Sequence, residues 1–138
     1  VFGQRDDPTY RDDAVEIFVS PNPAKLRNYY GFEINVIGTM LNFIRADWDQ
    51  GPFNPEPEGV RLRTSYPGLR VKHESPDDDH WVLELAIPLH NFAKDAAHTP
   101  PREGDEWRLN LNRAGGKTNA QYSTWSPVTS DRPNFHVP

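Results

Sequence analysis

Hydrophobic and polar residues alternate along two neighbouring stretches near the N-terminus, residues 12–20 and 28–36. Because successive side chains of an extended strand point to opposite faces of a sheet, this alternation predicts two β-strands and assigns their residues to faces. The aliphatic side chains of the first strand share one face: Val15, Ile17 and Val19. Glu16 lies on the other face, beside the aromatic side chain of Phe18.

The second strand also separates its apolar side chains from its polar ones. One face carries Tyr30, Phe32, Ile34 and Val36, and the other carries Tyr29, Gly31, Glu33 and Asn35. The two strands together predict a sheet with one apolar face and one face of carboxylate, amide and aromatic groups. Such a mixed face suits the recognition of a polar, ring-shaped ligand.

Further short strands follow, separated by turns that proline and glycine mark. We expect them at residues 39–45, 60–64, 69–73, 81–89, 106–113 and 121–126. Pro88 has no N–H group to give to a strand ladder, so its strand should end there, and residues 89–97 can form one or two helical turns. Three tryptophans are expected in the core: Trp81, Trp107 and Trp125. Trp48 lies in a long polar loop and is the tryptophan free to act as a surface platform.

Length and composition favour one all-β domain. The chain has 138 residues, enough for a single core, and its 14 prolines and 9 glycines interrupt many short apolar runs. The net charge is −5 and lysine and arginine form no stripe, which argues against nucleic acid as a partner. No apolar run approaches the roughly 20 residues needed to cross a membrane. Cysteine is absent, which excludes disulfides, thiol catalysis and zinc–thiolate sites.

Motifs for catalysis and metal binding are sparse. The sequence contains no Gly-x-Ser-x-Gly, phosphate-loop or dinucleotide fingerprint, and the sequence cannot place two of its glutamates across a glycosidase cleft. The five histidines lack the spacing of a transition-metal site. Calcium could bind the acidic run at residues 77–79 or the aspartates at 6, 7, 12 and 13, although such runs are usually solvated and none has EF-hand spacing. We therefore expect no enzyme, no catalytic residues, no metal site and no required cofactor.

Five segments of the chain, in this order, resemble the family 9 carbohydrate-binding modules. They are Tyr10-x-Asp-Asp-x-Val-Glu-Ile-Phe18, Asn28-Tyr-Tyr-x-Phe-Glu-Ile-Asn35, Trp81-x-x-Glu-x-Ala-Ile-Pro88, Gly104-Asp-x-Trp-x-x-Asn-x-x-Arg113, and Trp125-Ser-Pro with Phe135-His-x-Pro138. The resemblance implies an antiparallel β-sandwich of jelly-roll type, a general shape shared with DOMON-like domains. The family pattern begins before Tyr10 and continues after Pro138, so we expect residues 1–138 to be a single domain that is incomplete at both ends.

The resemblance also implies a sugar site. In sugar-binding members two aromatic rings clamp the terminal sugar, and Tyr10 and Phe135 occupy those places, where the best-known pattern has tryptophan. Glu16 matches the family's strand glutamate, and Asn35 matches the polar residue at the end of the next strand. Glu33 stands where the family has arginine, so an ionised side chain there accepts hydrogen bonds and donates none.

The favoured interpretation is a non-catalytic module that binds the terminal sugar of an oligosaccharide or polysaccharide. The resemblance implies a plant-type polysaccharide and a place in a larger secreted or cell-envelope protein, with covalently linked catalytic domains. Two alternatives stay open: a structural or protein-contact sandwich without a sugar site, and a haem-binding electron-transfer sandwich. The last needs axial ligands such as methionine and histidine, and Met40, the only methionine, lies within a predicted strand.

Overall fold

Short β-strands make up most of the regular structure. The computed structural model describes residues 1–46, 56–65, 81–117, 120–128 and 135–136. The strands in these residues are β1 (Ala14–Ser20), β2 (Tyr29–Asn35), β3 (Met40–Arg45), β4 (Arg61–Ser65), β5 (Val82–Ala86), β6 (Arg108–Ala114) and β7 (Tyr122–Thr124). Single 3-10 turns lie between them: η1 (Thr9–Arg11), η2 (Pro23–Lys25) and η3 (Leu89–Phe92).

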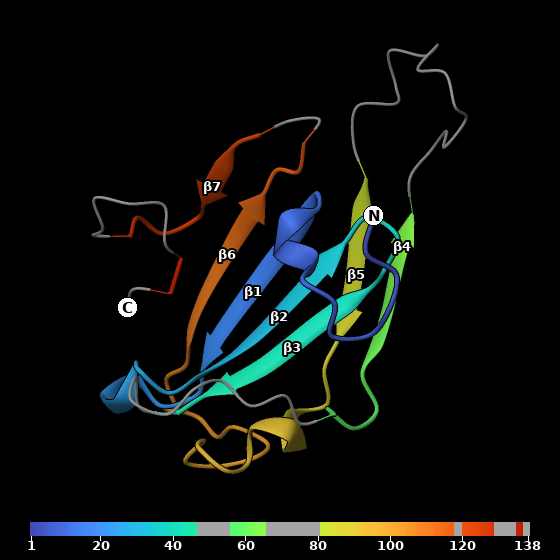
Figure 1. Ribbon diagram of the computed structural model, residues 1–138. Coiled ribbons are helices and arrows are strands. Elements are labelled where there is room, and N and C mark those ends of the chain that lie inside the picture. The colour runs from blue at the N-terminus through green and yellow to red at the C-terminus, as the bar shows by residue number, and fades with distance from the viewer. Residues whose placement is uncertain (47–55, 66–80, 118–119, 129–134, 137–138) are drawn as a thin grey trace.

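The strands form two antiparallel sheets that pack face to face as a β-sandwich (Figure 1). The larger sheet has the order β3-β2-β1-β6-β7, so β1 is its central strand. The smaller sheet pairs β4 with β5 and packs against the β2 and β3 side of the larger sheet. The all-β, antiparallel class predicted from the sequence is confirmed.

The pairing register gathers the apolar residues of the larger sheet on one face. Val15 lies opposite Ile34, and Ile17 lies opposite Phe32. This face forms the main core, whose buried members are Tyr30, Phe32, Ile34, Met40, Ile44 and Phe92. Leu62, Leu83 and Leu85 of the smaller sheet pack against it. Removing this apolar surface from water stabilises the sandwich by about 25 cal/mol for each Å² buried, so the core holds the two sheets together.

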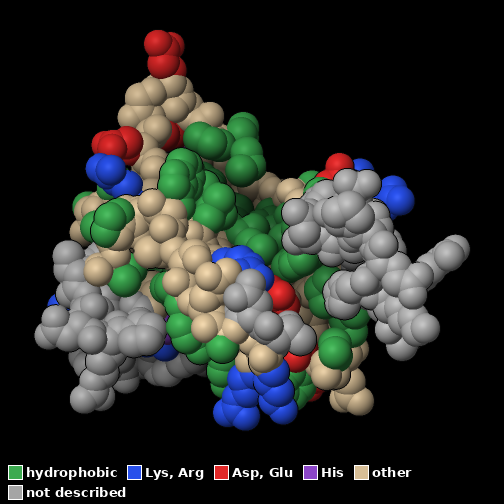
Figure 2. Space-filling model, turned by 90° about the horizontal axis from the view of Figure 1, so that it is seen from above, with side chains coloured by type: hydrophobic (Ala, Val, Ile, Leu, Met, Phe, Trp, Pro, Cys, Tyr) green, Lys and Arg blue, Asp and Glu red, His purple; other side chains and the backbone are tan. Residues whose placement is uncertain are grey.

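Hydrophobic side chains also reach the surface when the molecule is seen from above (Figure 2). Several of the exposed ones lie at the β6 and β7 side of the larger sheet: Leu109, Leu111, Tyr122 and Trp125. The smaller sheet contains two strands in the described residues, and it covers the β2 and β3 side. The β6 and β7 side is therefore less well covered.

Most of the predicted strands are confirmed, with ends shifted by one to three residues. The strand β5 ends at Ala86, before Pro88, and η3 supplies the helical turn that was expected after it. The predicted strand at residues 69–73 lies outside the described residues, as do Trp48 and residues 77–79.

The three tryptophans predicted for the core have different surroundings. Trp107 packs against Phe92, with ring centroids 5.2 Å apart, and is partly buried against the main core. Trp81 is half-buried at the start of β5. The prediction for Trp125 is wrong, because its side chain is 70% exposed. It follows the short strand β7, which has no further strand beside it in the described part of the sheet.

A glycine allows aromatic rings to pack closely over the second face of the larger sheet. Phe18, Tyr29 and Phe43 form a cluster there, with ring centroids 5.3 to 6.0 Å apart. Gly31 lies between Phe18 and Phe43 in the register, and a Cβ atom at this position would overlap the Phe43 ring. The missing side chain therefore provides the space that the Phe43 ring fills.

Gly31→Ala should destabilise the domain, because the added methyl group must displace the Phe43 ring. Overpacking of this kind costs about 1–3 kcal/mol. Urea unfolding followed by tryptophan fluorescence measures the change, and Gly3→Ala is the matched control because its Cβ would meet nothing within 4 Å. A Gly31→Ala variant as stable as the parent chain would contradict this account of the packing.

Candidate functional site

Polar side chains form a row across the middle of the second face of the larger sheet, which we call the polar face. Glu16 of β1 lies opposite both Glu33 of β2 and Asn112 of β6. Residues directly opposite on antiparallel strands have Cβ atoms about 4.5–5.5 Å apart, so the three side chains are neighbours. Their exposed fractions are 4%, 3% and 3%. We call these three residues the acidic row.

Burial changes the protonation of the two glutamates. Loss of hydration raises the pKa of Glu16 to about 7. Loss of hydration, together with the negative charge of Glu16, raises the pKa of Glu33 to about 8. Both shifts come from burial and from the proximity of the two carboxyl groups, whereas a cation close to the pair would favour the ionised forms. Near neutral pH the pair therefore retains a proton, and a protonated carboxyl group can donate a hydrogen bond as well as accept one.

Several polar atoms of the acidic row have no hydrogen-bond partner among the described residues. They are Oε2 of Glu33 and both Nδ2 and Oδ1 of Asn112. Leaving a buried polar group unpaired costs about 1–3 kcal/mol, and the great majority of buried polar groups in native proteins find a partner. The row therefore offers carboxyl and amide groups to a polar ligand.

A pocket of about 290 Å³ adjoins the acidic row on the same face. Phe18 and Asn110 line this pocket, and each lies two residues from Glu16 or Asn112 on the same strand, about 7 Å along it. Further lining residues are Ser20, Tyr29, Arg108, Phe135 and His136. The volume is at the lower end of the range of roughly 300–1,000 Å³ for small-molecule sites, so it suits a single ring.

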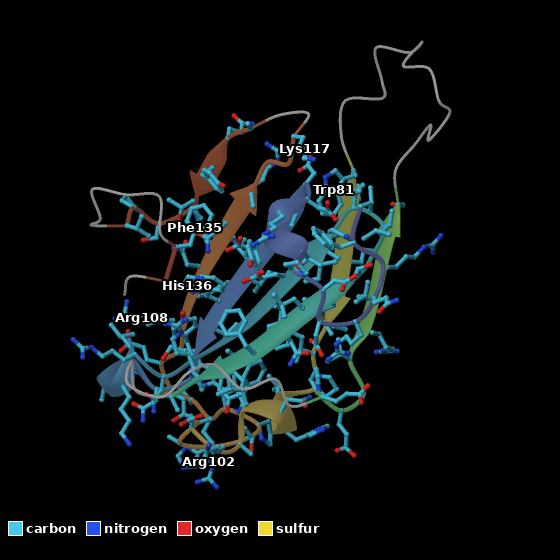
Figure 3. The ribbon with its side chains drawn as sticks, in the orientation of Figure 1. Trp81, Arg102, Arg108, Lys117, Phe135 and His136 are labelled. Carbon is cyan, nitrogen blue, oxygen red and sulfur yellow. The ribbon has the colours of Figure 1, made fainter. Side chains whose placement is uncertain are left out.

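His136 closes the pocket over the sheet, and Figure 3 shows it with Phe135 beside β6. Its ring stacks on Phe18 with centroids 5.1 Å apart, and its Nδ1 atom lies 2.7 Å from the hydroxyl oxygen of Tyr29. Burial and the positive charge of Arg45 lower the pKa of His136 to about 4, so the imidazole is neutral at physiological pH. Burial raises the pKa of Tyr29 to about 12, so its hydroxyl group stays protonated. A neutral hydrogen bond therefore holds this segment against the sheet.

The two residues predicted to clamp a sugar have different environments. Phe135 lines the pocket and packs edge-on against Tyr122, with ring centroids 5.8 Å apart. Tyr10 lies in η1 and is 44% exposed, with the Arg11 guanidinium 5.6 Å from its ring centroid. Tyr10 does not line the pocket described above. Phe135 is thus placed beside the candidate site, while the clamp formed with Tyr10 stays a prediction.

Asn35 uses its side chain to hold the fold together. Its Nδ2 atom donates to the Phe2 carbonyl at 2.8 Å and to the Asp12 carboxylate at 3.0 Å. Its Oδ1 atom accepts from the backbone N–H of Thr39 at 2.9 Å, and the residue is fully buried. These bonds tie the end of β2 to the N-terminal segment, and the ligand contact predicted for Asn35 stays a prediction.

The two aspartates before β1 have the same kind of structural role. Asp12 also accepts from the backbone N–H of Phe2 at 2.8 Å. Asp13 accepts from Nη2 of Arg113, which lies 3.1 and 3.2 Å from its two carboxylate oxygens. These contacts fasten the start of β1 to its surroundings. In the described parts of the chain, no group of three or more His, Cys, Asp or Glu side chains is arranged to hold a metal ion.

Fold and site together define a class of protein. Carboxyl, amide and aromatic groups beside a small pocket on an antiparallel sandwich are the features of a candidate site for a small polar ligand. The sequence profile of carbohydrate-binding family 9 matches residues 1–138, and the chain belongs to this family. The resemblance drawn from the five sequence segments is confirmed.

A solved structure has a similar fold. It is the crystal structure of a candidate carbohydrate-binding protein from Bacteroides uniformis, with a TM-score of 0.70 and 24% sequence identity. The similarity covers 97% of this chain and 61% of that chain, so the chain spans about three fifths of its neighbour's length. At this identity the similarity concerns the fold alone. No curated protein sequence matches the chain.

Two residues at the site could be predicted from the sequence only in part. The alternation in β6 places Asn112 on a polar face, but only the pairing of β6 with β1 brings it beside Glu16. The alternation could therefore have marked Asn112 as a candidate. His136 lies next to a predicted clamp residue, yet no local pattern signals that its ring stacks on Phe18.

The acidic row should make the domain less stable as the pH rises. The folded state binds the protons of Glu16 and Glu33 more tightly than the unfolded chain does, so their contribution is complete below about pH 4.5 and is lost as the pH passes 7 and 8. Between pH 6.5 and 9 the expected loss of unfolding free energy is on the order of 3 kcal/mol. Glu33→Gln should remove roughly two thirds of this loss, because the pKa of Glu33 is the higher of the two, as measured by urea unfolding over this range.

Glu84→Gln is the control for this measurement, because Glu84 lies exposed on β5 in the other sheet. It should leave the pH dependence of stability unchanged. If Glu33→Gln and the parent chain lose stability equally over this pH range, the carboxyl groups are not buried as described.

Proposed function

We propose that the domain is a non-catalytic module that binds the terminal sugar of an oligosaccharide or polysaccharide on its polar face. The observation that supports this proposal is the acidic row, whose unpartnered polar atoms lie beside an aromatic-lined pocket. A pyranose has apolar C–H faces that aromatic rings cover, and a rim of hydroxyl groups that bond to carboxylates and amides. The polar face carries both kinds of group, about 7 Å apart along its strands.

The geometry favours binding over hydrolysis. Glycosidases place two carboxyl groups on either side of the scissile bond, whereas Glu16 and Glu33 project side by side from one sheet face. In catalytic pairs the environments separate the two pKa values, so that one group is an acid and the other is ionised. Here burial raises both pKa values. Membership of a carbohydrate-binding family agrees with a binding role.

We further propose that the domain belongs to a larger secreted or cell-envelope protein that carries catalytic domains on the same polypeptide. Domains of this family usually occur in extracellular proteins. The similar chain from Bacteroides uniformis extends beyond the matched region, which agrees with a longer polypeptide. Among the described residues, no helix is long and apolar enough to cross a membrane.

A protein-contact role is the second candidate. It is favoured by the exposed aromatic side chains of Tyr122 and Trp125, which are 60% and 70% exposed near the edge of the larger sheet. Exposed aromatic residues are common at protein interfaces. The two candidates differ in the surface they use, so variants of the acidic row distinguish them.

Isothermal titration of the chain with cellobiose, xylobiose and glucose should detect binding of at least one of these sugars. Glu16→Gln and Asn112→Ala should each weaken the binding by about tenfold, because each removes a hydrogen-bonding group from the acidic row. The exposed Glu84→Gln variant should bind as the parent does. If no sugar binds to the parent chain, the proposal fails, and if both variants keep full affinity, the acidic row is not the site.

Removing an aromatic ring tests the clamp separately. Phe135→Ala and Tyr10→Ala should each weaken sugar binding by roughly two- to tenfold, the contribution of one ring beyond its buried area. Val82→Ala, which shortens an exposed apolar side chain on β5, is the control. A loss of affinity in Phe135→Ala but not in Tyr10→Ala would keep the pocket and contradict the clamp.

A further inference from the structure

The acidic row holds two carboxyl groups and one amide, and none of its three residues is basic. Glu16 and Glu33 are adjacent and buried, and Oε2 of Glu33 has no partner among the described residues. Two buried carboxyl groups cannot both ionise at low cost unless a cation compensates them. The site is therefore short of positive charge.

Glu33 explains this shortage. Glu33 lies on one side of Glu16 in the register and neutral Asn112 lies on the other, so neither neighbour compensates the charge of an ionised Glu16. A ligand that carries its own positive charge would supply what the row lacks.

We infer that the domain selects amino sugars, with the protonated amino group of the ring donating to Glu16 and Glu33 and a neighbouring hydroxyl group bonding to Asn112. This inference rests on the proposed function, because it assigns a ligand class to the same site. An ammonium group is compact and offers three hydrogen-bond donors. Hydrogen bonds between a cation and a carboxylate are roughly twice as strong as neutral ones, so the ammonium group gains more here than a hydroxyl group would.

Other charged groups around the pocket favour the same orientation of the amino sugar, with its ammonium group at the acidic row. Arg108 lines the pocket four registered pairs from the acidic row, and it is exposed and paired with Glu106 at 2.9 Å. Arg45 lies at the end of β3, near enough to lower the pKa of His136, which is itself neutral. The positive charges thus lie at one end of the polar face and the carboxyl groups at its middle. An ammonium group is drawn to the acidic row and away from the arginines.

A calcium ion is the competing cation, and the row fits it less well. Calcium takes about 6–8 oxygen ligands, whereas the row offers two carboxyl groups and one amide oxygen. The Nδ2 donor of Asn112 has no use at a metal ion, but a sugar hydroxyl group can accept from it. The described residues provide no third acidic or histidine side chain to complete a metal cluster.

Titration calorimetry at pH 6.5 with glucosamine, N-acetylglucosamine and glucose tests the inference. The three ligands share one ring, and only glucosamine carries a positive charge. We expect glucosamine to bind at least about tenfold more tightly than the other two. Since the ammonium group favours ionised carboxyl groups, its binding should release protons, which appear as a dependence of the heat on the ionisation enthalpy of the buffer.

Variants show which residues cause the preference for glucosamine and the release of protons. Glu33→Gln should reduce both the preference for glucosamine and the release of protons, the double variant Glu16→Gln with Glu33→Gln should abolish both, and the control Glu84→Gln should keep both. Glu33→Arg should reverse the preference towards glucose. If a variant does not fold, the dependence of the parent chain's binding heat on the ionisation enthalpy of the buffer still tests the inference.

The outcomes separate the inference from the proposed function. Equal affinity for glucosamine and glucose would overturn the inference and leave the proposed function intact, and no binding of any of these sugars or of cellobiose and xylobiose would overturn both. A preference for glucosamine without proton release would place the amino group elsewhere and would also overturn the inference. Titration with calcium chloride completes the test, because calcium binding that Glu33→Gln abolishes would assign the row to a metal ion instead.

Discussion

The register of the central strand β1 is the constraint on which the rest of this structure depends. Side chains pack on both faces of β1, so alternate residues of this strand lie in two different environments. Val15 and Ile17 pair with the aliphatic and aromatic residues of the main core, while Glu16 joins the acidic row. A slip of one residue would exchange these two sets. It would bring a carboxyl group into the core and two aliphatic side chains to the polar face, so the fold and the candidate site are fixed by the same pairing.

The parts of this arrangement that depend on local alternation could be predicted from the sequence. The two faces of β2, the end of β5 before Pro88 and the mixed character of the polar face all follow from residues close together in the chain. The parts that depend on distant residues could not. Nothing local shows that β6 pairs with β1 and so places Asn112 beside Glu16, or that Trp125 remains exposed at the sheet edge. A prediction of burial from hydrophobic character alone fails where no neighbouring strand covers the side chain.

Hydrogen bonding divides the polar residues on and next to the strands β1, β2 and β6 into two groups. Asp12, Asp13 and Asn35 have their polar atoms engaged by backbone groups or by other side chains, so they fasten the strands. Glu33 and Asn112 retain polar atoms with no partner in the described structure, although both are nearly inaccessible. A buried polar group is normally paired. The first group thus accounts for the fold, and the second group needs a further explanation, which the proposed ligand would provide.

The cost of the acidic row supports this division. Two adjacent buried carboxyl groups destabilise a folded domain as the pH rises, and a glutamine or an apolar residue at position 33 would avoid that cost. Strain and unfavourable burial are tolerated in proteins where they serve binding or catalysis. The row lies beside an aromatic-lined pocket and not within the main core. In the core, only the packing of neighbouring side chains could offset the cost of burying two carboxyl groups. The position of the row therefore allows the missing positive charge to come from outside the chain, and the cationic ligand that we propose would offset part of this cost when it binds.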